Sequence, residues 1–147
     1  MRVVYLASVW LHIVAAMTWI GGMVVFVAAV MPYFRLRPEE ERARFLDWFG
    51  ARFRVVSWWC FGILIATGTF NLAARGVRPG DFLRPEWRAS TFGSLALVKL
   101  SLVAIAIAVS AAHERITAKH WARWMGRGLL LIGLAIVAVA ILLVRAL

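Results

Sequence analysis

The sequence has little of what a disulfide-stabilised or soluble catalytic protein needs. Its 147 residues contain one cysteine, which excludes an internal disulfide framework and a cysteine-rich metal cluster. Asp and Glu together number 7, and none lies in the long apolar runs, so hydrolase chemistry or a carboxylate proton relay there has no candidate residues. Hydrophobic residues make up 63%, against about 45–50% in a soluble domain. A chain this short has too little interior to bury that surface, which excludes disorder and argues against a water-soluble protein.

Four long apolar runs predict an all-α integral membrane four-helix bundle. A bilayer core of about 30 Å requires about 20 helical residues. The runs cover about residues 3–31, 55–73, 91–112 and 128–147, which would make residues 1–147 a single transmembrane domain. The first run exceeds one bilayer thickness, so we expect it to tilt or protrude and to stop at Pro32. It is also too long for the apolar part of a signal peptide, so we expect it to remain in the mature protein.

The connections between the runs differ in character. The acidic triplet Glu39–Glu41 precedes a segment that predicts a short interfacial amphipathic helix around Phe45, Trp48 and Phe49. Residues 74–90 are rich in Gly, Pro and Arg and predict a loop.

The net charge of +10 is explained by a membrane rather than by nucleic acid, because the Arg and Lys residues flank the apolar runs. We therefore expect a lipid bilayer, and no nucleic acid, as partner. Ten basic residues follow the first and third runs: Arg35, Arg37, Arg42, Arg44, Arg52, Arg54, Arg115, Lys119, Arg123 and Arg127. Six lie on the other side: Arg2, Arg75, Arg78, Arg84, Arg88 and Arg145. The positive-inside rule then places both termini outside an inner (plasma) membrane.

An ionisable side chain inside a span calls for a structural or functional explanation, since placing one at mid-membrane costs roughly 2.5–3.5 kcal/mol. His12 and Lys99 lie at similar depths in two spans that run in the same direction. The second span runs oppositely, so Thr67 and Asn71 near its end reach the same layer, with Arg75 just beyond. The sequence therefore predicts one polar layer that gathers these five residues.

His113 does not belong to that layer. It lies fourteen residues after Lys99, which is about 21 Å along a helix and places it near the opposite membrane surface. A haem held by two histidines of one chain is therefore not expected. Haem at His12 would be five-coordinate, or completed by Lys99 or by a second subunit, and His113 is the weaker metal candidate.

Structural roles for the same residues stay open. His12 could hydrogen-bond a neighbouring helix, and Thr67 and Asn71 could be polar contacts between helices. Lys99 could extend to the outer interface. Trp19 lies seven residues after His12 on the same helix face, and it could line the pocket of a flat cofactor or pack in the core.

Copper would require soft ligands, for which Met17, Met23 and Cys60 are the candidates within the spans. The two methionines face different ways, and Cys60 lies in the other half of the bilayer from His12. Direct copper chemistry is therefore weakly supported by the residues.

The chain resembles the copper-resistance D (CopD) family over about two-thirds of its length. The first stretch is Leu11–Gly22 (LHIVAAMTWIGG), which leads to Pro32. The second runs from Arg52–Arg54 to Thr67–Asn71 (TGTFN), and the third from Thr91–Gly93 through Lys99–Val103 to His113. The resemblance implies copper uptake or tolerance.

The spacing of His12 and Trp19, together with Lys99-Leu100-x-Leu102-Val103, also resembles HemJ-type protoporphyrinogen oxidase, a four-span family of about this size. That resemblance implies haem b near a first-helix histidine with a third-helix lysine close by, which match His12 and Lys99.

We accordingly expect a membrane protein that binds haem b and acts in electron transfer or porphyrin redox chemistry. His12 would be the axial ligand, and Lys99 either the second ligand or a cation beside a propionate. Trp19, Thr67 and Asn71 would line the pocket, and Arg75 would pair with a propionate. A homodimer could supply a missing ligand, and the sequence does not identify a redox partner. The alternatives are a copper uptake or tolerance protein and a cofactor-free membrane scaffold.

Overall fold

The computed structural model describes residues 2–115 and 119–145, and these residues form helices with no strand among them. Four helical stretches are long and apolar enough to cross a membrane: Arg2–Arg35, Glu39–Ala74, Thr91–His113 and Trp124–Arg145. The all-α fold class is confirmed, and the chain is a multi-pass membrane protein. The last two residues of the predicted fourth span lie outside the described residues.

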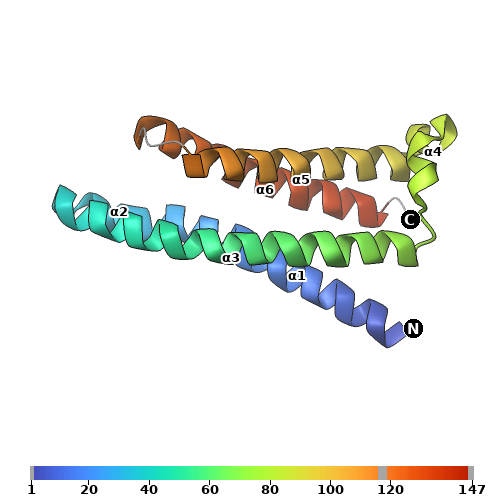
Figure 1. The fold of residues 1–147 in the computed structure, drawn as a ribbon, viewed down its shortest axis with the longest axis horizontal. Helices are drawn as coiled ribbons and strands as arrows, with labels where there is room; N and C mark the ends of the chain where they lie inside the picture. The colour runs from blue at the N-terminus through green and yellow to red at the C-terminus, as the bar shows by residue number, and fades with distance from the viewer. Residues whose placement is uncertain (1, 116–118, 146–147) are drawn as a thin grey trace. The chain divides into compact units, whose positions relative to one another are not determined.

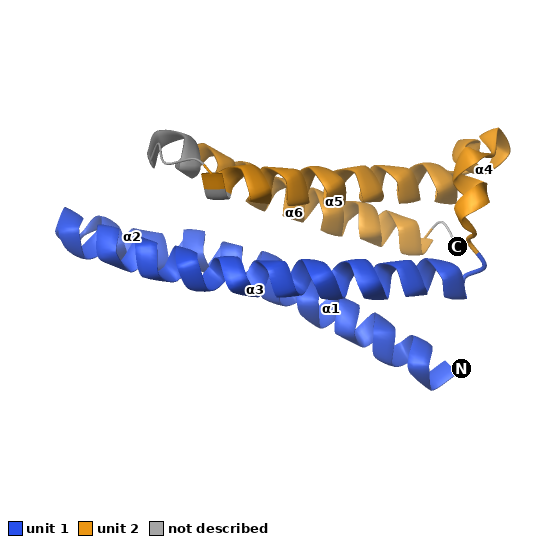
Figure 2. Ribbon diagram, viewed as in Figure 1, with its two compact units in different colours: residues 1–76 blue, residues 77–147 orange. Residues whose placement is uncertain are grey.

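The helices belong to two compact units, Met1–Gly76 and Val77–Leu147 (Figure 2). The first unit contains α1 (Arg2–Val25), the π-helical turn η1 (Phe26–Val30), α2 (Met31–Arg35) and α3 (Glu39–Ala74). The second contains the 3₁₀ turn η2 (Pro79–Leu83), α4 (Pro85–Ala89), α5 (Thr91–Arg115) and α6 (Lys119–Arg145) (Figure 1).

In the first unit α1 and α3 pack as an antiparallel pair. The start of α1 meets the end of α3 where Arg75 Nε donates to the Tyr5 hydroxyl at 3.3 Å. Further along, the rings of Trp19 and Phe61 lie 4.8 Å apart. Buried side chains of this pair are Ala15, Trp19, Ile20, Met23, Cys60, Phe61 and Thr67.

Pro32 does not stop the first helix, so that prediction is wrong. Helix α1 is followed by the π-helical turn η1 just before Pro32, and the helix then continues as α2 to Arg35. Proline lacks a backbone N–H, and its ring clashes with the carbonyl four residues earlier. A π-helical turn at this point is a known way to relieve that conflict without ending a helix. The first membrane helix is therefore longer than the apolar run indicated.

The separate interfacial helix predicted around Phe45, Trp48 and Phe49 is also wrong. These residues belong to α3, which is continuous from Glu39 to Ala74. The acidic triplet occupies the first turn of α3, where negative charge is favourable. Phe45 stacks on Phe34 at 4.0 Å between ring centroids, and Phe49 stacks on Phe26 at 4.6 Å. The aromatic side chains therefore pack against the first helical stretch.

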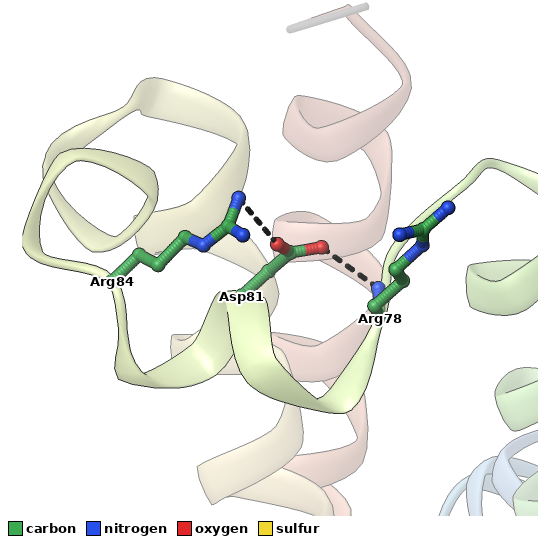
Figure 3. A network of polar contacts seen from close by, with 3 residues as sticks. All are labelled: Arg78, Asp81 and Arg84. Atoms are coloured by element: carbon green, nitrogen blue, oxygen red, sulfur yellow. Dashed lines mark hydrogen bonds and ion pairs between the residues drawn. The ribbon is translucent and has the colours of Figure 1, made fainter.

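The predicted loop over residues 74–90 is wrong for most of its length, because η2 and α4 form an ordered corner of the second unit before α5. In η2, Asp81 Oδ2 accepts the Arg78 backbone N–H at 2.8 Å, and its Oδ1 lies 3.3 Å from Arg84 Nη1 (Figure 3). Ser90 caps α5 by accepting the Gly93 N–H at 3.0 Å. Helix α6 begins at Lys119, whereas the apolar run predicted a start at about residue 128.

Candidate functional site in the first membrane unit

The polar residues of the α1–α3 pair form a line along the contact between the two helices. We call this line the polar seam and define it by Tyr5, Ser8 and His12 of α1, Thr67 and Asn71 of α3, and Arg75 directly after α3. Its members recur every three or four residues on each helix, a spacing that places side chains on one helix face. The contact between the His12 and Thr67 side chains confirms that these two residues share one layer.

His12 Nδ1 lies 2.8 Å from Thr67 Oγ1. The Thr67 hydroxyl in turn donates to the Ile63 carbonyl at 2.6 Å. Because a hydroxyl has only one proton, Thr67 Oγ1 must accept from His12, and Nδ1 is the nitrogen that carries hydrogen. The neutral imidazole then has its lone pair on Nε2.

This arrangement is the one that metal-binding histidines adopt. A ligating histidine usually donates its other ring N–H to an oxygen, which selects the tautomer and orients the ring. The hydrogen bond also joins two membrane helices, so it agrees equally with the structural role that the sequence left open for His12.

Gly68 provides room for the His12 ring. A Cβ placed on Gly68 would lie 3.3 Å from His12 Cε1 and 3.9 Å from Nδ1, which is tight for the first contact. Glycine at this position therefore allows α3 to approach the imidazole closely. Sequence reasoning did not identify Gly68, although it directly follows Thr67.

Asn71 and Ser8 contribute buried polar atoms with unmet hydrogen-bonding capacity. Asn71 Oδ1 and Ser8 Oγ are both buried and have no hydrogen-bond partner. Asn71 lies one helical turn beyond Thr67, as its predicted place in the layer requires, and Ser8 lies one turn before His12. The sequence analysis missed Ser8, because a single serine in a transmembrane helix is a weak signal.

The polar seam ends at Arg75, directly after α3. Arg75 is exposed and contacts Tyr5. Beside this pair is an open hollow of about 510 Å³ lined by Arg2, Val4, Tyr5, Phe70 and Ala74. Arg2 and the Tyr5 phenol thus line a mostly apolar depression at one end of the helix pair, and Arg75 contacts that phenol.

Trp19 and the sulfur-containing residues occupy other places. Trp19 is 3% exposed and packs on Phe61, so it is part of the helix-pair core two turns from His12. Met17 is exposed, whereas Met23 and Cys60 are buried. The described residues contain no group of three or more His, Cys, Asp or Glu side chains that could hold a metal ion.

Lys99 and His113 belong to the second unit. Lys99 is half-buried in α5, and its approach to His12 stays a prediction. His113 lies in the last turn of the same continuous helix, with Nδ1 buried and without a hydrogen-bond partner. The continuity of α5 confirms the predicted separation of about 21 Å between these residues along the helix axis.

Comparisons of the chain with protein-family models, with curated proteins and with solved structures give no match.

Proposed function

We propose that the chain is a haem-b-binding membrane protein, with His12 as the axial ligand, that acts in electron transfer or porphyrin redox chemistry. The observation that carries the proposal is the hydrogen-bond chain from His12 through Thr67 to Ile63, which assigns the lone pair to His12 Nε2. A porphyrin supplies four nitrogen ligands, so haem requires only one or two ligands from the protein. A single oriented imidazole is therefore sufficient.

The other residues near the polar seam fit the same group. Arg75 at the end of the seam is a cation suited to a propionate, and Asn71, one helical turn beyond Thr67, would line the pocket. Lys99 would be a second ligand or a second propionate partner. When bound, haem supplies one-electron redox chemistry, whereas the chain holds and orients the axial ligand. The likeness of the His12 and Lys99 segments to HemJ-type protoporphyrinogen oxidase supports this proposal.

The orientation and assembly are part of the proposal. The basic residues favour both termini outside the plasma membrane. A homodimer would give a five-coordinate haem a route to a second ligand.

An absorption spectrum of the purified full chain in detergent tests the proposal. We expect a Soret band in the wild type, its loss in His12→Ala, and its retention in His113→Ala, the matched histidine control. Lys99→Met separates the two lysine roles, because loss of an iron ligand shifts the band whereas loss of a propionate partner leaves it in place. A colourless wild type that binds Cu(I) would overturn the haem proposal in favour of copper, and one that binds neither would leave a scaffold.

A further inference from the structure

Ser8 differs from three other hydroxyl residues of its unit, Thr18, Ser57 and Thr67, in how its side chain is used. Thr18, Ser57 and Thr67 each donate to the backbone carbonyl four residues earlier, at 2.6–2.9 Å. Ser8 makes no such bond, although α1 begins at Arg2 and the carbonyl of Val4 precedes it by one turn. Its hydroxyl is buried and without a partner.

The helix register places Ser8 opposite Asn71. His12 contacts Thr67, and Tyr5 contacts Arg75. Ser8 lies between Tyr5 and His12 on α1, and Asn71 lies midway between Thr67 and Arg75 on α3. Ser8 Oγ and Asn71 Oδ1 therefore lie at the same level of the seam. They do not hydrogen-bond to each other, since neither has a hydrogen-bond partner.

We propose that Ser8 Oγ and Asn71 Oδ1 bind an internal water molecule, which joins the Tyr5–Arg75 pair and the His12–Thr67 pair into a route for proton exchange from the membrane surface. An amide oxygen requires a donor, while a hydroxyl can donate or accept, and water provides both roles. Buried waters characteristically satisfy such groups. Successive levels are about 5–6 Å apart along the helices, and two hydrogen bonds through one water span about 5.6 Å.

This inference concerns the polar seam alone and holds whether or not a cofactor binds at His12. Its consequence is that solvent protons reach the interior of the membrane protein along a path of hydroxyl, amide and water. The mouth of the path is the exposed end at Arg75.

The composition of the chain makes the water site directly measurable. Asn71 is the single asparagine and the chain has no glutamine, so its side-chain amide gives the only carboxamide signal in a ¹⁵N spectrum. With the full chain in lipid nanodiscs, we expect this amide to show a cross-peak to bound water. Ser8→Ala should remove the cross-peak and slow exchange of the amide with D₂O by about tenfold, because the water that relays the exchange loses one of the hydrogen bonds that hold it.

Three further variants make the result decisive. Ser8→Thr retains the hydroxyl and should retain the cross-peak. Ser57→Ala removes a hydroxyl from the same unit but away from the seam, and should leave both readouts unchanged. Tyr5→Phe should slow the exchange while leaving the cross-peak, because it alters only the mouth. A wild type without a water cross-peak, or equal spectra for Ser8→Ala and Ser57→Ala, would overturn the proposal.

Discussion

At the scale of single residues, Thr67 determines how His12 is held. Thr67→Val keeps the shape but leaves the His12 Nδ1–H without its acceptor, and we expect it to destabilise the chain by about 0.5–2 kcal/mol, the range for polar contacts between membrane helices. Thr67→Ser keeps the hydroxyl and should cost less. Unfolding of both variants in a detergent titration measures the difference. Equal stability of the two variants would contradict the role assigned to the hydroxyl.

The sequence could predict part of this arrangement and not the rest. The shared depth of His12, Thr67 and Asn71 follows from run lengths and helix direction, which are properties of the sequence. The direction of each hydrogen bond does not, because it depends on rotamers set by packing. The roles of Gly68 and Ser8 depend on which faces of two helices meet, and apolar run length carries no information on that.

At the scale of elements, the corner before α5 depends on Gly93. A Cβ on Gly93 would overlap the Trp87 carbonyl, with its carbonyl carbon only 2.8 Å away, and backbone cannot move aside as a flexible side chain can. We expect Gly93→Ala to destabilise the chain by about 1–3 kcal/mol, as overpacking does. Thermal unfolding followed by circular dichroism measures the change.

Gly62 in α3 is the matched control for this prediction. A Cβ there would meet nothing within 4 Å. Gly62→Ala should therefore stabilise the chain by up to about 1 kcal/mol through helix propensity. Stabilisation by both substitutions would show that the corner tolerates a side chain.

Element boundaries were the least predictable feature for an identifiable physical reason. Hydropathy reports where a helix is apolar, not where its hydrogen bonds begin and end. The polar first third of α3 therefore resembled a connection, although the acidic triplet at its start favours a helix. At Pro32 a helix end was predicted where the helix continues, because a π-helical turn precedes the proline.

At the scale of the whole molecule, composition together with the length of the apolar runs was sufficient for the fold class. A chain that is 63% hydrophobic can satisfy its backbone in lipid only by helices or a closed barrel. The apolar runs have the length of helices, and the residues that the structure describes form four membrane-length helices. The site could not be derived at this scale, because it depends on a few polar atoms inside one helix pair.

Four spans place both termini on one side of the membrane, and the excess of Arg and Lys after the first and third spans predicts that this side is outside. Reporter fusions at each terminus, at residues 36–38 and at residues 76–79 test the arrangement. A phosphatase that is active only outside should work at both termini and at 76–79, and a fluorescent reporter that folds inside should work at 36–38. Replacing Arg35, Arg37 and Arg42 by alanine nearly removes the charge bias, so this variant should insert in both orientations. Termini on opposite sides would contradict four spans, whereas both termini inside would contradict only the charge rule.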